Sequence, residues 1–216
     1  MDKTFIGHKA KLLNPDMDGI VLQMNSWSSE KMVPKYAISL DNDIKIVRVA
    51  EDNISFGEKV SDEMYFNRIL RDIQSGEELT REHASEVLCD FLEFEIENID
   101  LSLLKSGIQK IIEQIKVENN INAEHKLVEG LFEFIWHKKI SKKAEIDLLE
   151  RLTEIDKYYV WSYLGDEITE DIKSYNSGKL NDYYSKNIEK WKEKDIQMYG
   201  KEKMGEYYAK LNKTSG

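Results

Sequence analysis

The sequence predicts an α+β protein, in which a small β-rich N-terminal unit precedes a mostly antiparallel α-helical bundle. Two observations lead to this fold class. Apolar and polar residues alternate in short segments of residues 5–54, which is the period of a half-buried strand. After residue 57 the apolar residues recur with the helical period of 3.6. We therefore expect three regions: a β-rich unit (1–57), a helical bundle with an acidic helix (58–165), and aromatic, Lys-rich C-terminal helices (166–216).

Four short strands are predicted in the first region: Lys9–Leu13, Ile20–Met24, Tyr36–Leu40 and Ile44–Val49. The turn residues Asn14-Pro15-Asp16 follow the first strand, and Asp41-Asn42-Asp43 join the last two into a hairpin. This strand spacing resembles that of an SH3-like or Tudor-like barrel, which implies a curled sheet. The alternative, which we favour, is a plain meander packed on the helices.

Capping residues predict where the helices begin. The candidate N-caps are Ser61, Thr80, Asp100 or Ser102, Asn122, Ser141 and Thr169. Gly76 is expected to end the first helix, and Gly178 the short helix that starts at Thr169. One long helix is expected after Ser141, because Leu148, Leu152, Ile155 and Tyr159 share one helical face. The short connections predict antiparallel neighbours.

Aromatic residues gather in the last third of the chain. They include Tyr158-Tyr159, Tyr183-Tyr184, Tyr207-Tyr208, Trp161 and Trp191. Tyr and Trp are common both at interfaces and where helices pack against one another. We interpret this group as packing between helices.

Composition and charge narrow the classes of function. No apolar run approaches the roughly 18 residues of a membrane helix, and the N-terminus lacks the apolar core of a signal peptide. We therefore expect a cytoplasmic protein without membrane contact. The net charge of −10 argues against direct binding of nucleic acid. Lys outnumbers Arg by 26 to 5, which is typical of an AT-rich genome and favours a bacterium or its phage.

Linear motifs of catalysis are absent from the sequence: it contains no HExxH, Glu-x-x-His, P-loop, G-x-G-x-x-G or G-x-S-x-G. The single cysteine, Cys89, excludes an internal disulfide and a thiolate zinc cluster. Carboxylates around Cys89 should raise its pKa, so we interpret it as structural. His125 with Glu129, and Glu133 with His137, lie one turn apart and are interpreted as surface ion pairs. We predict no cofactor, no metal site and no catalytic residue, and we lean towards a non-enzymatic protein.

One segment departs from an ordinary surface. Glu77–Asp100 contains nine acidic residues and one basic residue, Arg81. On a helix, a carboxylate stripe occupies one arc and the apolar residues occupy the opposite arc. The stripe consists of Glu82, Glu86, Asp90, Glu93 and Glu97. Like charges at i,i+4 cost a few tenths of a kcal/mol each, and a purely structural surface would more often interleave Lys. The simplest interpretation is a solvated face, and the alternative is a binding surface.

These observations predict a protein–protein interaction protein whose partner-binding residues are the five carboxylates of the stripe. A negative surface attracts a positive one, so the expected partner is a basic protein, such as a nucleic-acid-acting toxin or nuclease. The stripe would then occupy a groove meant for phosphates, as in an immunity protein or a phage-encoded anti-defence inhibitor. Two alternatives remain: an enzyme with a carboxylate or histidine site that has no linear motif, and a scaffold or assembly component.

Overall fold

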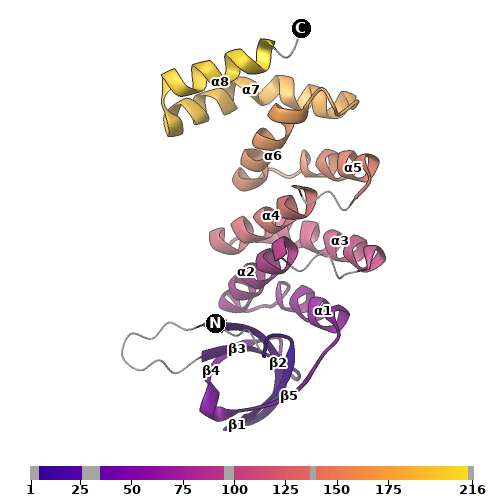
Figure 1. The fold of residues 1–216 in the computed structure, drawn as a ribbon, viewed down its shortest axis with the longest axis vertical. Coiled ribbons are helices and arrows are strands. Elements are labelled where there is room, and N and C mark those ends of the chain that lie inside the picture. The colour runs from indigo at the N-terminus through magenta and orange to yellow at the C-terminus, as the bar shows by residue number, and fades with distance from the viewer. Residues whose placement is uncertain (1–4, 26–34, 95–99, 137–139, 214–216) are drawn as a thin grey trace. The chain divides into compact units, whose positions relative to one another are not determined.

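The computed structural model describes residues 5–25, 35–94, 100–136 and 140–213. The chain forms two compact units, unit 1 (Met1–His137) and unit 2 (Lys138–Gly216) (Figure 1). Unit 1 contains a five-stranded antiparallel sheet followed by helices, and the elements of unit 2 are helices. The predicted α+β fold class, with its N-terminal β unit, is therefore confirmed. The boundary between the units lies at residue 137, whereas the sequence predicted boundaries after residues 57 and 165.

The sheet of unit 1 is strongly curled (Figure 1). Its strands are β1 (His8–Leu13), β2 (Asp16–Asn25), β3 (Lys35–Leu40), β4 (Ile46–Ala50) and β5 (Ile54–Lys59), in the order β4-β3-β2-β1-β5. The first four strands form a meander. A 3-10 turn, η1 (Glu51–Asn53), then returns the chain so that β5 pairs with β1. The four predicted strands thus form the meander we favoured, and a fifth strand that was not predicted pairs with the outer side of β1.

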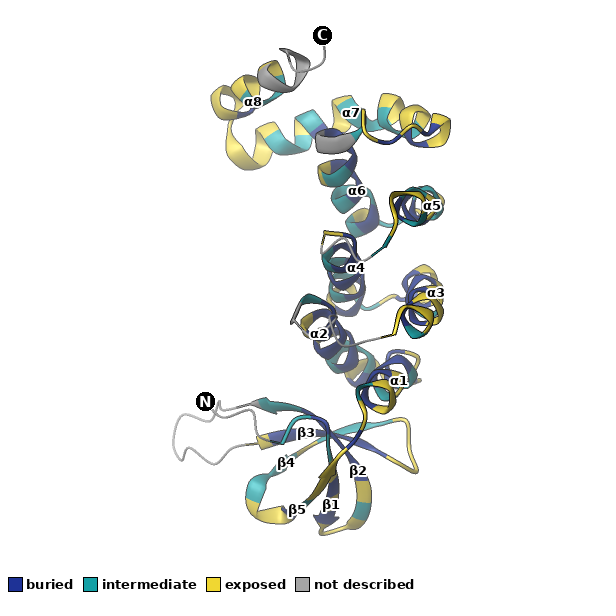
Figure 2. Ribbon diagram, turned by 45° about the vertical axis from the view of Figure 1, so that its right-hand side comes forward, coloured by how far each residue is buried: buried dark blue, intermediate teal, exposed yellow. Residues whose placement is uncertain are grey.

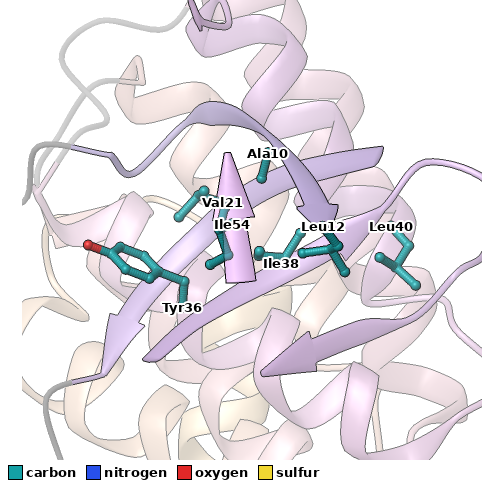
Figure 3. Packing of buried hydrophobic residues seen from close by; sticks show 7 residues of the cluster. All are labelled: Ala10, Leu12, Val21, Tyr36, Ile38, Leu40 and Ile54. Atoms are coloured by element: carbon teal, nitrogen blue, oxygen red, sulfur yellow. The ribbon is translucent and has the colours of Figure 1, made fainter. Parts of the chain in front are cut away.

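The interior of the curled sheet is a compact apolar cluster (Figure 3). It consists of Ala10, Leu12, Val21, Tyr36, Ile38, Leu40 and Ile54. Phe5 and Phe56 stack against its edge with ring centroids 4.0 Å apart. At Gly19 a Cβ atom would lie 2.4 Å from the carbonyl oxygen of Ser39, so only glycine permits the approach of β2 to β3 there.

Helix α1 (Asp62–Asp72) is bonded directly to the sheet. Its predicted N-cap is confirmed, because the Ser61 side chain accepts a hydrogen bond from the Met64 amide. The Tyr65 hydroxyl donates to the Leu22 carbonyl at 2.8 Å, and Arg68 donates to the Leu40 carbonyl at 3.0 Å. These bonds join helix and sheet into one unit, which is why the first unit does not end at residue 57.

Three further helices complete unit 1: α2 (Glu78–Phe94), α3 (Leu101–Val117) and α4 (Ile121–Trp136). Figure 2 shows buried residues in dark blue where α2 and α4 meet. The two helices approach closely at Gly130, where a Cβ atom would lie 3.0 Å from the Cα atom of Cys89. The predicted cap at Asp100 is confirmed, since its carboxylate accepts from the Ser102 amide at 2.7 Å.

Two predicted caps of unit 1 are wrong. Helix α2 begins at Glu78, and Thr80 lies inside it, buried, with its hydroxyl accepting from the Ile46 amide of β4 at 3.2 Å. At α4 the cap is Asn120, whose Oδ1 accepts from the amides of Asn122 and Ala123 at 2.9 Å each. At α4 another side chain caps the helix, and at α2 the hydroxyl of Thr80 is engaged by strand β4 instead.

Unit 2 contains α5 (Lys142–Leu152), α6 (Tyr158–Asp171), α7 (Gly178–Tyr199) and α8 (Lys201–Lys213). The Ser141 cap of α5 is confirmed. The prediction of a single long helix after Ser141 is wrong, because α5 ends at Leu152 and α6 begins only at Tyr158. Just after α5, the Thr153 hydroxyl donates to the Glu150 carbonyl at 2.7 Å.

Two other helix boundaries predicted for unit 2 are also wrong. Thr169 lies inside α6 instead of capping a helix. Gly178 begins α7, with Ser177 as its cap, instead of ending a helix. At the other end of α7, Gly200 has a φ of 89°, a conformation that glycine adopts readily, and so it permits the turn into α8.

Trp191 of α7 lies at the centre of the packing in unit 2. Its indole Nε1 donates to the Trp161 carbonyl at 3.0 Å, and its ring contacts those of Tyr183 and Tyr184. Gly165 of α6 makes room for it, since a Cβ atom there would lie 2.5 Å from Nε1 of Trp191. Trp161 and Trp191 therefore pack between α6 and α7, as predicted, whereas Tyr183 and Tyr184 lie on the same helix as Trp191 and Tyr158 is 60% exposed. None of the helices in the described parts of the chain has the length and apolarity required to cross a membrane.

Candidate partner-binding face on helix α2

Helix α2 is packed on two sides and open on the third. On one side Phe91 stacks on Phe66 of α1, with ring centroids 5.4 Å apart. On another side Cys89 and Leu92 lie against Gly130 of α4. The remaining arc carries Glu82, Glu86, Asp90 and Glu93, so the structure brings four of the five predicted carboxylates together on one open face. The fifth, Glu97, lies outside the described residues.

The four carboxylates have different surroundings. Glu82 is half-buried, and its two oxygens accept from the side-chain amides of Asn122 at 3.0 Å and Asn120 at 3.3 Å. Within the described parts of the chain, neither Glu86 nor Glu93 has a cationic side chain at ion-pair distance. Glu82 therefore helps to hold α4, whereas Glu86 and Glu93 have carboxylates that remain available to a partner.

An apolar side chain lies within the same arc. Leu79 is 74% exposed, and its angular position around the helix axis lies between those of Glu86 and Asp90. Sequence analysis did not single it out, because one leucine in an acidic helix is ordinary. We call the set Leu79, Glu82, Glu86, Asp90 and Glu93 the acidic face. It combines an exposed apolar group with negative charge, which is a combination that a basic protein surface can cover.

At one edge of the acidic face, α2 contacts strand β4 through a histidine. Arg48 of β4 donates from Nε to Nε2 of His83 at 3.0 Å. Burial and the Arg48 guanidinium lower the pKa of His83, although Glu86 and Glu82 act in the opposite direction. The imidazole is therefore neutral at pH 7 and accepts the arginine hydrogen bond, which holds the Arg48 charge at this edge.

At the other edge, the charges belong to α4. Lys126 pairs with Glu129 at 2.5 Å, and Asp90 adds to the negative field that raises the pKa of Lys126. The nearby Cys89 is buried, and burial first, followed by Glu129, raises the pKa of its thiol to about 12. The predicted direction was right, although burial outweighs the carboxylates as its cause. A thiol this weakly acidic is a poor nucleophile, which fits a structural role.

The α3–α4 turn next to the acidic face is held by a buried carboxylate. Glu118 accepts from Arg81 Nε at 2.8 Å, from Arg81 Nη2 at 3.1 Å and from Gln114 Nε2 at 2.8 Å. The amides of Asn119 and Asn120 donate to it at 3.0 and 2.9 Å. Burial raises the pKa of Glu118, but these donors outweigh it and lower the pKa overall.

Arg81 connects this turn to the start of α2. Its Nη1 donates to the Ser75 carbonyl at 3.0 Å and to the Gly76 carbonyl at 3.3 Å. Sequence reasoning missed the Arg81–Glu118 pair because the two residues lie 37 positions apart. The available signal was that Arg81 is the one basic residue in the acidic segment.

A cavity of about 380 Å³ lies on the outer side of the sheet, beside α1. Its charged lining residues are Lys9, Lys11, Arg68, Asp18 and Asp41. Arg68 pairs with Asp41 at 2.5 Å, and Lys9 pairs with Glu58 at 2.6 Å. Lys11 pairs with Asp16 at 3.2 Å, so each of the three cations has a carboxylate partner.

Among the described residues, no three His, Cys, Asp or Glu side chains are grouped so that they could hold a metal ion. Of the two predicted pairs, His125 with Glu129 is described, and His137 lies outside the described residues.

In comparisons with known proteins, no family model matches the chain, and neither a curated protein nor a solved structure matches it.

Proposed function

We propose that this protein is a cytoplasmic, non-enzymatic protein-binding module whose acidic face docks onto the basic surface of another protein. The observation that carries the proposal is the pair of carboxylates, Glu86 and Glu93, that lack a cation within the described residues. Like charges one turn apart on a helix weaken it slightly, and a basic partner would reverse that cost. Such a face also speeds encounter and favours one class of partner.

The partner class follows from the shape of the face. Carboxylates recur along α2 about every 6 Å, the rise of four helical residues, in a row that Lys and Arg side chains could line. Proteins that act on nucleic acids present such cations in grooves that bind phosphates. We therefore propose a toxin or nuclease as the partner and blockade of its groove as the consequence, as in an immunity protein or a phage-encoded anti-defence inhibitor.

The test compares two variants that change the net charge by the same amount. Glu86→Lys with Glu93→Lys alters the acidic face, whereas Asp52→Lys with Glu113→Lys alters exposed acids on η1 and α3. Each tagged protein is used as bait in an extract of the native host, washed at low and at high salt. Bound proteins are identified by mass spectrometry, and the affinity of the purified partner is then measured by calorimetry.

We expect the wild type and the control variant to retain one basic protein at low salt and to release it at high salt. The acidic-face variant should lose at least about tenfold in affinity, because reversal adds like-charge repulsion. Equal affinity of all three proteins would refute the proposal. So would a partner whose binding does not depend on salt.

A further inference from the structure

Two exposed apolar side chains lie at the ends of the α3–α4 turn. Val117, the last residue of α3, is 72% exposed, and Ile121, the first residue of α4, is 66% exposed. Single exposed apolar residues are ordinary on protein surfaces. Here two exposed β-branched residues flank one turn of three residues, and we call this pair the apolar corner.

The turn that carries this corner is rigid. Its first residue, Glu118, has a fully buried side chain that accepts hydrogen bonds from Arg81, Gln114 and two turn amides. Its last residue, Asn120, caps α4. A partner that covers Val117 and Ile121 would therefore lose little free energy in ordering the backbone beneath them.

The corner is also continuous with the acidic face. The Asn120 side-chain amide donates to Glu78 at 2.7 Å and to Glu82 at 3.3 Å, and the Asn122 amide donates to Glu82 at 3.0 Å. Carboxylates of α2 thus lie directly beside the residues that separate Val117 from Ile121. The matching surface on a partner is an apolar side chain flanked by arginine or lysine.

We propose that Val117 and Ile121 form the apolar contact of the binding surface, and that the partner inserts an apolar side chain there while its flanking cations meet the carboxylates of α2. The inference rests on the proposed function, because the acidic face supplies the other half of the contact. Burial of apolar surface at Val117 and Ile121 would contribute affinity that salt does not screen. The segment of the partner that binds here would contain both basic and apolar residues.

Two synthetic hexapeptides of equal charge serve as probes. One has four arginines around two central leucines, and the other has serines in the central positions. Each is titrated into the full-length protein, and NMR follows the backbone amides of α2 and the methyl groups of Val and Ile. The binding variant is Val117→Ser with Ile121→Ser. The control is Leu101→Ser, which removes a leucine that is 52% exposed at the opposite end of α3.

Both peptides should shift the α2 amides, and the leucine peptide should also shift the methyl signals of Val117 and Ile121. The leucine peptide should bind about tenfold more tightly, as expected for partial burial of an aliphatic side chain. The binding variant should lose this preference and keep its affinity for the serine peptide. The control should retain the preference.

A preference that survives in the binding variant would overturn the inference, as would equal affinity of the wild type for both peptides. If the wild type binds both peptides equally and the serine peptide shifts the α2 amides, the proposed function is supported and the apolar contact is refuted. If the methyl signals of Val117 and Ile121 shift while the α2 amides do not, binding at the acidic face is refuted and the apolar contact is supported.

Discussion

Helices α2 and α7 are both long and rich in charged residues, but their charges are arranged differently. On α7 lysines and carboxylates are interleaved, and three of the lysines are paired: Lys179 with Glu154 at 2.6 Å, Lys192 with Glu189 at 2.7 Å, and Lys194 with Asp166 at 3.6 Å. On α2 the exposed carboxylates are not interleaved with Lys, and Glu86 and Glu93 have no cation within the described residues. Interleaved charges of both signs are typical of a solvated surface. Charge of one sign without cationic partners supports the proposal that α2 carries a binding surface.

The same two helices also differ in how deeply their ion pairs are buried. The Arg81–Glu118 pair of α2 has a fully buried carboxylate, whereas the Lys192–Glu189 pair of α7 has a Glu side chain that is largely exposed. We expect Glu118→Ala to destabilise unit 1 by about 3–5 kcal/mol, because it leaves a partly buried guanidinium without its carboxylate partner. Glu189→Ala should change the stability of unit 2 by less than about 1 kcal/mol.

Urea denaturation followed by NMR signals of each unit measures both changes. If the two variants lose similar stability, the distinction between a structural ion pair on α2 and solvated pairs on α7 does not hold. A loss for Glu118→Ala that appears only in unit 2 would contradict its assignment as the support of the α3–α4 turn.

Two glycines of unit 2 differ in how closely other residues pack against them. Gly165→Ala places a Cβ atom about where Trp191 of α7 lies, 2.5 Å from its Nε1. We expect this overpacking to destabilise unit 2 by about 1–3 kcal/mol. Gly205→Ala on α8 meets no atom within 4 Å and should stabilise unit 2 by about 0.5–1 kcal/mol through helix propensity. The urea midpoints of the two variants should therefore move in opposite directions, and a shared direction would refute the packing argument.

The features that sequence analysis predicted correctly are local ones. The caps at Ser61, Asp100 and Ser141 depend on a side chain and an amide two or three residues away. The acidic arc of α2 depends only on the helical period. Strand β5 was missed because Ser55, Gly57 and Glu58 dilute its apolar pattern, although Ile54 and Phe56 do alternate inward.

The features that were predicted wrongly depend on distant residues or on competing groups. Thr80 is not a cap because its hydroxyl meets Ile46 of β4, 34 positions away. Within the candidate site, local sequence identified the carboxylates but not which of them the fold uses. Glu82 is bonded to Asn120 and Asn122, about 40 residues further along the chain, and that pairing is visible only in the folded structure.

The dependence of stability on pH tests the role of the buried carboxylate of Glu118. The pKa of Glu118 is lowered in the folded state, so the ion pair contributes stability above the pKa of the unfolded chain and loses it as pH falls. We expect unit 1 to lose stability on acidification towards pH 3, and Glu118→Gln to weaken this dependence. Equal slopes for wild type and Glu118→Gln would contradict the assignment.

The smallest expected effect bears most directly on the comparison of α2 with α7. Glu86→Lys places a cation between Glu82 and Asp90, one turn away on each side, and should stabilise unit 1 by a few tenths of a kcal/mol. On α7, Lys192→Glu removes the pair with Glu189 and should destabilise unit 2 by a similar amount. Urea titrations of both variants measure the two changes. If Glu86→Lys instead destabilises unit 1, Glu86 serves the fold and the acidic face loses one of its two free carboxylates. A gain in stability accompanied by a loss of partner binding would show that α2 retains an unfavourable charge pattern because a partner requires it.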